Sequence, residues 1–348
     1  MPERKLATIR QIDAIKPIEG ADKIELAIIG GWQVVVNKDL YQPGSLVVFC
    51  EIDSWIPHEL APFLSKGKEP KEFEGVKGER LRTIKLKGCI SQGLVLPIQC
   101  CIDLQYITPY LCDDVTELLC IKKWEKPIPV QLRGQVKGNF PSGYPKTDQE
   151  RIQNLSEFIG TEQQPGAYKE HLWSLTEKLH GSSCTFILDS DGEFHVCSRN
   201  LDLKEDATNA YWKLARKINA EEIMRQHNLY GYAIQGEMLG EGINGNNYKK
   251  DLEFYAFDAY DSNTNMYLLP GVFQALMQKI GFQQVPVLNS YYWMPKELTV
   301  ASILSHAEGQ SSVHGAEGVQ REGIVWRSHT KHDLSFKAVS NAWLQQYE

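Results

Sequence analysis

The chain has 348 residues, a formal net charge of −7 and an ordinary globular composition. That length allows two domains with sizeable cores. The acidic balance argues against a protein that coats nucleic acid non-specifically, but it leaves room for a local basic face.

Targeting segments are not evident in the sequence. No stretch approaches the ~20 apolar residues of a membrane span, and the first five residues lack the apolar core of a signal peptide. The eight cysteines include no CxxC pair. We therefore expect reduced thiols in a cytoplasmic, intracellular protein that has no membrane partner.

Residues 1–100 have the pattern of an all-β domain. Short β-rich runs recur between glycine and proline residues, and this spacing predicts a small barrel. The expected strands are 6–9, 24–29, 32–36, 45–49, 81–86 and 93–96.

One basic segment, 78–88, lies inside this region. Its four cations alternate with apolar residues, as in a single strand with one wet face. They are Arg80, Arg82, Lys85 and Lys87. Two interpretations stay open, namely contact with nucleic acid and an edge strand that is protected by charge.

Residues 101–130 are expected to be a connector, and a mixed α+β pattern begins at about 131. An Asp-Gly pair between apolar runs predicts a hairpin, which would bring Arg199 roughly opposite Ser182. Antiparallel sheets are expected around two helices. The predicted hairpin strands are 184–188 and 193–199, the further strands 232–235, 252–260, 323–326 and 334–339, and the helices 205–230 and 272–280.

The run 177–183, Glu-Lys-Leu-His-Gly-Ser-Ser, precedes that hairpin and is the most informative feature of the chain. A lysine in a strand-bound pocket near an arginine is a candidate nucleophile toward phosphate. Only the neutral amine attacks, and nearby positive charge, a metal ion or partial burial favours it. The alternative interpretation is a surface lysine before a turn, because a KxxG string by itself is common.

Further elements follow Lys178 in a fixed order, and the order is harder to dismiss than any one of them. An aromatic strand is usually core, and a Glu-Gly pair usually marks a turn. The elements are 198–200, Glu237 between two glycines, the strand 254–258, Glu322 at a strand start, and Lys337.

Taken together, these residues resemble the covalent nucleotidyltransferase superfamily of ATP-dependent ligases and mRNA-capping enzymes. The resemblance covers 131 to the end of the chain and implies an ATP-grasp-like nucleotidyltransferase domain over 131–348. The run 177–183 is similar to motif I, 198–200 to motif Ia, 254–258 to motif III, Glu322-Gly323 to motif IV and Lys337 to motif V.

The order of the two regions indicates which branch of the superfamily the chain resembles. DNA ligases and capping enzymes carry an OB domain after motif V, whereas only 11 residues follow Lys337 here and the β-rich region comes first. That order resembles the nick-sealing RNA ligases with an N-terminal OB domain, of the Naegleria and Deinococcus type. The segment 145–154 also resembles the one that precedes motif I in that family. Histidine at position 180, where most of the superfamily has aspartate, is similar to phage nick-sealing RNA ligases and favours RNA.

The resemblance implies an ATP-dependent RNA ligase that acts in RNA repair. Lys178 would attack the α-phosphate of ATP, AMP would pass to an RNA 5′-phosphate, and a 3′-OH would then displace AMP. Mg²⁺ or Mn²⁺ would offset phosphate charge. The implied partner is RNA with 3′-OH and 5′-phosphate ends, with a nicked duplex favoured, bound by a monomer.

The resemblance also implies a role for each candidate residue. Lys178, Glu322 and Lys337 are the expected catalytic residues, and Glu237 and Glu322 the expected metal ligands. The expected nucleotide-binding residues are Glu177, His180, Gly181, Arg199, Glu237 and Phe257, with Lys146 and Arg151 toward pyrophosphate. The OB region would bind RNA through Arg80, Arg82, Lys85 and Lys87.

One departure and two rival functions remain. Val339 stands where motif V often has a second lysine, so phosphate contacts by such a lysine are not expected. A capping-type guanylyltransferase would form lysyl-GMP on the same lysine. A non-catalytic OB-type RNA-binding protein with a degenerate transferase domain would not be labelled covalently by any nucleotide.

Overall fold

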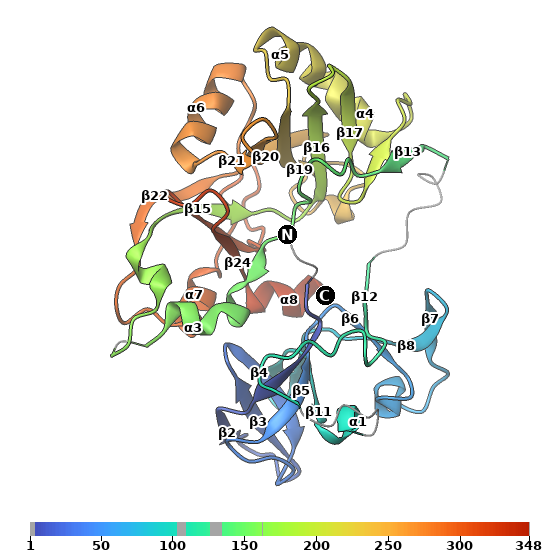
Figure 1. Cartoon of the computed structure of the whole chain (residues 1–348), viewed down its shortest axis with the longest axis vertical. Helices are drawn as coiled ribbons and strands as arrows, with labels where there is room; N and C mark the ends of the chain where they lie inside the picture. Colours follow the sequence, from blue (N-terminus) through green and yellow to red (C-terminus); the bar gives the residue numbers. More distant parts are fainter. Residues whose placement is uncertain (1–3, 103–108, 126–133, 162, 348) are drawn as a thin grey trace. The chain divides into compact units, whose positions relative to one another are not determined.

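The computed structural model describes residues 4–102, 109–125, 134–161 and 163–347 (Figure 1). The chain folds into two compact units. One comprises 1–127 with 344–348, and the other comprises 128–343. None of the helices among the described residues has the length and apolarity that crossing a bilayer requires.

The first unit consists mainly of short strands. Its elements are β1 (Ala7–Gln11), β2 (Ala14–Pro17), β3 (Ile24–Ile29), β4 (Trp32–Asn37), β5 (Leu46–Cys50), β6 (Ser54–Pro57), η1 (Pro62–Ser65), β7 (Lys71–Phe73), β8 (Val76–Arg80), β9 (Ile84–Leu86), β10 (Cys89–Ser91), β11 (Leu94–Pro97), α1 (Gln99–Ile102) and β12 (Lys122–Lys123).

Strand β5 lies at the centre of the first unit, because both of its faces are buried. Val48 and Cys50 pack into one apolar core, and Val47 and Phe49 into a second. The sheets run β1-β5-β11, β2-β3-β4, β12-β6-β8-β7 and β10-β9. Within the described residues, these ladders do not close into one hydrogen-bonded barrel.

The expected connector contributes to the first unit. Val115, Leu119 and Ile121 are buried in its core, and β12 pairs with β6. Residues 103–108 and 126–130 of the expected connector lie outside the described residues.

The second unit contains two larger sheets. Its elements are β13 (Val136–Asn139), β14 (Glu150–Arg151), η2 (Ile152–Leu155), α3 (Ser156–Ile159), η3 (Ala167–Glu170), β15 (Leu172–Lys178), β16 (Ser182–Leu188), β17 (Phe194–Cys197), β18 (Leu201–Leu203), α4 (Ala210–Lys217), α5 (Ala220–Gln226), β19 (Tyr232–Leu239), η4 (Asn244–Asn246), β20 (Glu253–Asp261), β21 (Met266–Tyr267), α6 (Pro270–Ile280), β22 (Val287–Trp293), α7 (Val300–His306), β23 (Gly323–Ser328) and β24 (Ser335–Val339), followed by α8 (Asn341–Tyr347).

The seven-stranded sheet has the order β13-β18-β17-β16-β19-β20-β21. Its core packs Phe186 and Phe254 against Trp212 of α4 and Met277 of α6, and Figure 1 shows α4, α5 and α6 beside this sheet. The predicted Asp-Gly hairpin is confirmed, with Leu188 paired to Phe194.

The single helix predicted over 205–230 is wrong. The structure has α4 and α5 instead, separated at Asn219, whose backbone is left-handed with a φ of 51°. Asparagine tolerates this conformation better than other residues with side chains. The predicted helix 272–280 is confirmed as α6, which Pro270 begins and the left-handed Gly281 ends.

The five-stranded sheet has the order β14-β24-β23-β15-β22. Trp173, Trp326 and Phe336 form its core together with Ile303 of α7. Strand β14 pairs with β24 in parallel, so that Arg151 lies opposite Lys337. The sequence analysis missed β15 and β22, which pair through a ladder with two register shifts.

Candidate active site

Lys178 is the last residue of β15, at the end of the five-stranded sheet. Strand β23 pairs with β15 so that Gly323 lies opposite Lys178. This register brings Glu322 to the lysine, and Nζ of Lys178 donates to Oε1 of Glu322 at 2.6 Å. The predicted lysine and the predicted motif IV carboxylate therefore meet directly.

The second carboxylate oxygen of Glu322 is buried. Among the described residues, no group donates a hydrogen bond to Oε2, and Nδ1 of His180 is 3.9 Å away from it. The His180 ring lies edge-on to Trp343 at 4.8 Å between centroids, and its backbone N–H donates to Oη of Tyr248 at 3.0 Å. A buried oxygen without a donor is a strong candidate to bind a cation.

Glu237 comes from the other sheet, on β19. Its Oε1 accepts a hydrogen bond from the backbone N–H of Gly181 at 2.9 Å. A Cβ at Gly181 would meet the carbonyl oxygen of Met238 at 2.3 Å. Glycine is required at this position because the two chain segments approach so closely.

The carboxyl group of Glu237 is poorly solvated and lies among charges. Burial first, and then the nearby Glu322, raise its pKa to about 7 against the lowering effects of Lys178, the Gly181 N–H and Arg199. These four side chains therefore share one electrostatic environment at the junction of the two sheets. A carboxyl group that titrates near neutral pH is typical of a functional site.

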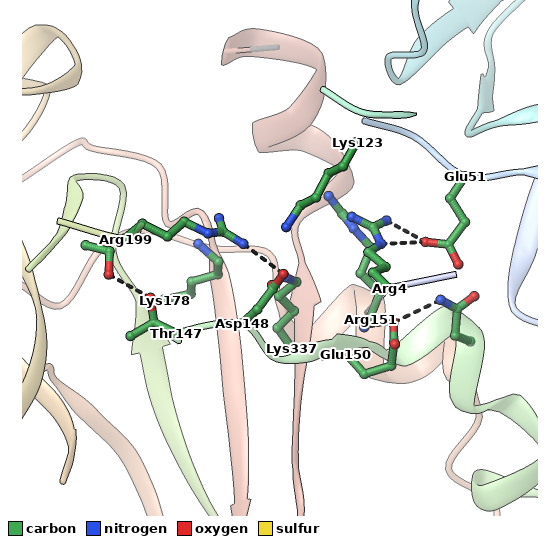
Figure 2. Close-up of polar contacts among 12 residues, drawn as sticks. Arg4, Glu51, Lys123, Thr147, Asp148, Glu150, Arg151, Lys178, Arg199 and Lys337 are labelled. Carbon is green, nitrogen blue, oxygen red and sulfur yellow. Dashed lines mark hydrogen bonds and ion pairs between the residues drawn. The ribbon is translucent and has the colours of Figure 1, made fainter. Parts of the chain in front are cut away.

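Asp148 links two further predicted cations, Lys337 and Arg199. Nζ of Lys337 donates to Oδ1 at 2.8 Å, and Nη2 of Arg199 lies 2.8 Å from Oδ2, as Figure 2 shows. The predicted position of Arg199 opposite Ser182 is wrong, because the β16–β17 ladder ends at Thr185 and Cys197. Arg199 reaches the site from the loop that follows β17.

Phe257 lies on β20 beside an apolar cluster that includes Leu179, the residue after the candidate nucleophile. The guanidinium of Arg327 is 5.6 Å from its ring centroid. Arg327 donates from Nε to Asp258 at 2.9 Å and from Nη1 to Thr176 at 3.2 Å. This buried pair joins β20 of one sheet to β23 and β15 of the other.

Glu177 turns away from Lys178 into the protein. Its carboxylate accepts hydrogen bonds from Oγ of Ser311 at 2.6 Å and from the N–H of Ser312 at 2.7 Å. Burial raises its pKa, and these two bonds oppose that effect. The contacts of Glu177 tie the loop before β23 to β15.

The two residues expected near pyrophosphate differ in exposure. Lys146 is exposed, and Arg151 is buried in β14. Both belong to the segment 145–151, which also carries Asp148. The segment runs between the two sheets, because Nε2 of Gln235 donates to the carbonyl of Pro145 at 2.7 Å while Arg151 pairs with Lys337.

The basic segment of the first unit is not the single strand that was predicted. Strand β8 ends at Arg80, and β9 begins at Ile84. Arg80 pairs with Asp53 and lies 4.0 Å above the ring centroid of Trp124. Lys85 is exposed on β9, and Lys87 is exposed in the two-residue turn before β10, where its φ is 48°.

The donor set at Glu237 and Glu322 suits a hard divalent cation. Both residues supply carboxylate oxygens, which Mg²⁺ and Mn²⁺ prefer, and the buried Oε2 of Glu322 has no competing donor among the described residues. A second cluster of possible ligands, Asp189, Glu193 and His195, lies on the β16–β17 hairpin. Lys137 forms ion pairs with Glu193 and with the neighbouring Asp202 there.

Sequence reasoning gave no role to Asp148 or Tyr248, which the structure places in contact with site residues. Asp148 lies in the segment 145–154, whose family resemblance was the only available signal. Nothing in the local sequence of Tyr248 points to His180.

Comparisons with known proteins agree on both units. A profile described as an RNA ligase matches residues 171–339, and one described as an OB-fold domain matches residues 6–98. A search of curated proteins finds no match. The solved structures that match include mutant and ligand-bound forms of Naegleria gruberi RNA ligase.

A ligand-free mutant of that ligase is 40% identical with a TM-score of 0.88, over 100% of this chain and 99% of the other. The ligase with PPi is 40% identical with a TM-score of 0.87, over 99% of both chains. A mutant with ATP and Mn is 39% identical with a TM-score of 0.86, over 98% of both chains.

Proposed function

Because this chain belongs to the RNA ligase family, we propose that it joins a 3′-OH to a 5′-phosphate at a nick in duplex RNA, through AMP carried on Lys178. The enzyme is an ATP-dependent RNA ligase that uses a divalent metal ion. The observation that carries the proposal is the contact of Lys178 with Glu322, which joins the candidate nucleophile to a carboxylate 144 residues away.

Lys178 is the proposed nucleophile. Its neutral amine attacks the α-phosphorus of ATP, a bond from Nζ to phosphorus forms, and the bond to the pyrophosphate oxygen breaks. The RNA 5′-phosphate then attacks the same phosphorus and releases the lysine, and the 3′-OH finally attacks the activated 5′-phosphate and releases AMP. Glu322 is within reach of the ammonium proton that Lys178 must lose.

Glu237 and Glu322 are the proposed metal ligands. A bound divalent ion would neutralise phosphate charge and favour the unprotonated lysine. Glu237 lies in the electric field of Lys178, Glu322 and Arg199, so a cation bound by the two carboxylates would offset the repulsion between them.

The remaining nucleotide contacts are proposed from the positions of the side chains. Lys337 and Arg199 face one anion, Asp148, and are assigned to phosphate oxygens. Phe257 is assigned to adenine stacking, because it adjoins the apolar cluster next to Lys178. Lys146 and Arg151 are assigned to pyrophosphate.

The first unit is the proposed RNA-binding domain, in which the exposed Lys85 and Lys87 would contact the RNA backbone. Lysines in a hairpin contact phosphates without reading bases, which suits a nicked duplex of any sequence. A monomer is proposed, as the resemblance to nick-sealing RNA ligases implies. An intracellular location is proposed because the substrate is ATP and the cysteines are free thiols.

Labelling the full chain with α-³²P-ATP and Mg²⁺ tests this proposal. We expect label on the wild-type protein and none on Lys178→Ala or on Lys178→Arg, since a guanidinium stays protonated. Labelled GTP should give no adduct, which excludes the guanylyltransferase alternative. Label that persists on Lys178→Ala would contradict the assignment, and sealing of single strands but not nicked duplexes would contradict the substrate.

A further inference from the structure

Asp148 bridges two cations that come from different sheets. One oxygen accepts from Lys337 on β24 at 2.8 Å, and the other lies 2.8 Å from the guanidinium of Arg199, which follows β17. Lys337 is only 13% exposed, Asp148 29% and Arg199 43%. Figure 2 shows the carboxylate between the two cationic groups.

The backbone on both sides of Asp148 is anchored. The carbonyl of Pro145 accepts from Gln235, and Oγ1 of Thr147 lies 2.7 Å from Oγ of Ser183, so the first half of the segment is fixed to the seven-stranded sheet. Arg151 is fixed to the five-stranded sheet through its pairing with Lys337. The position of this carboxylate is therefore set by the fold, unlike that of a mobile surface ion pair.

Carboxylate and phosphate oxygens accept from the same donors, and arginine and lysine bind both. If Lys337 and Arg199 meet ATP phosphate, as the proposed function has it, the Asp148 carboxylate occupies the place of phosphate oxygens. It also carries a negative charge that an incoming phosphate must overcome.

We propose that Asp148 is a positioning residue that stands in for nucleotide phosphate. It keeps Lys337 and Arg199 aligned while the site holds no nucleotide, and it gives up at least one of them when ATP binds. This inference rests on the proposed phosphate contacts of Lys337 and Arg199. The exchange replaces one anion by another at the same donors and requires no movement of either sheet.

The test is equilibrium binding of α,β-methylene-ATP, whose methylene bridge Lys178 cannot cleave, to the full chain with Mg²⁺. Asp148→Asn keeps the shape of the side chain and removes its charge, so the two cations attract phosphate unopposed. We expect the Kd to fall about fivefold, the effect of one nearby unit charge in a well-solvated site. With ATP itself, the KM should fall more than the maximal rate of lysyl-AMP formation changes, because bound phosphate then aligns the cations.

Two comparisons identify the cause. Glu150→Gln removes a charge from the same segment at a residue that contacts Asn154, and it should leave the Kd unchanged. In a Lys337→Met background, Asp148→Asn should lose most of its effect, because one of the two competing contacts no longer exists. Asp148→Ser, a smaller neutral residue, should act like Asp148→Asn and replaces it if that variant does not fold.

Unchanged or weaker binding by both neutral variants would overturn the inference, as would a full gain that persists without Lys337. A structural role alone would lower affinity and maximal rate together. If these results appear while the wild type is still labelled by ATP and Lys178→Ala is not, only the stand-in role of Asp148 fails. Loss of labelling by the wild type would instead contradict the proposed function.

Discussion

Lys178 and Glu322 form a 2.6 Å hydrogen bond although 144 residues separate them in the chain. The bond exists because β15 and β23 are neighbours with Lys178 opposite Gly323. An ammonium that donates to a carboxylate is fixed in position but is not yet a nucleophile. Glu322 thus holds the lysine in place, and in the proposed mechanism Lys178 must give up a proton before it attacks.

Glu322→Gln should slow adenylation at saturating ATP by about 10²-fold, the lower end of what a positioned proton acceptor contributes. The amide keeps the shape but neither holds the ammonium by charge nor binds a divalent ion well. Single-turnover labelling across a Mg²⁺ titration measures this effect. Glu317→Gln, at an exposed position in the preceding loop, is the matched control, and equal rates in the two variants would make Glu322 structural only.

The folding stability of the metal-free protein should depend on pH through Glu237. Its pKa is raised from 4.5 to about 7 by burial, so the folded protein holds this proton more tightly than the unfolded chain does. The resulting stability is complete below about pH 4.5 and is lost as the pH rises through about 7. Thermal melts should show a Tm that falls over that window in wild type and less so in Glu237→Gln.

Added Mg²⁺ should reverse this loss, because a cation favours the ionised carboxylate. The Tm gain from Mg²⁺ should therefore be larger at pH 8 than at pH 6, and adenylation at limiting Mg²⁺ should rise through about pH 7. A Tm gain that is independent of pH would separate Glu237 from the metal.

Breaking the Arg327–Asp258 pair should destabilise the second unit strongly. Arg327→Met leaves Asp258 buried without its cation, at an expected cost of about 3–5 kcal/mol, measured by urea unfolding. Arg216→Met is the control, since Arg216 is itself exposed and pairs with Glu205 and Glu221 at the surface, and the cost should be about 0–1 kcal/mol. Arg327→Met with Asp258→Leu should recover part of the loss.

Gly181→Ala should impair both stability and adenylation. The new methyl group would meet the Met238 carbonyl at 2.3 Å, so the chain must shift and the bond from Gly181 to Glu237 must lengthen. Overpacking of this kind costs about 1–3 kcal/mol. Gly143→Ala, which has open space around it, should have a far smaller effect in the same melts and labelling assays.

RNA binding by the first unit should depend on salt through Lys85 and Lys87. Each lost phosphate contact shallows the log–log salt slope by about 0.9 for duplex RNA, if RNA follows the B-DNA value. The double variant Lys85→Gln, Lys87→Gln should thus shallow the slope by the amount expected for two lost contacts, about 1.8. It should leave ATP affinity unchanged. Lys5→Gln, at another exposed lysine of the first unit, is the control. An unchanged slope in the double variant would mean that the charges of this hairpin only protect an exposed strand edge and do not bind RNA.

The sequence analysis was most successful where contacts are local or motifs are ordered. The Asp-Gly hairpin is confirmed because its signal lies within the turn itself, and the order of an OB-fold followed by a ligase domain is confirmed by the comparisons. The break at Asn219 was missed because its neighbours continue the helical periodicity. The contact of Asp148 with Lys337 spans 189 residues, and no local pattern carries such information.

Strands β15 and β22 were missed for a different reason. Strand β15 is buried along almost its whole length, and β22 carries valine, tyrosine and tryptophan on its exposed side. The hydrophobicity of neither sequence therefore follows the alternation of a half-buried strand. The ladder of β15 with β23 keeps one register throughout, and it places Lys178 opposite Gly323.

The two sheets of the second unit also differ in how far apart in the chain their partners lie. Neighbours such as β16 and β17, or β19 and β20, are joined by short connections, so most of the seven-stranded sheet can form soon after its residues are synthesised. Strand β15 must wait for β22 and β23, more than a hundred residues later. A nascent chain therefore carries Lys178 for 144 residues of synthesis before Glu322 follows, and the reactive centre of the ligase can assemble only after β23 and β24 have been made.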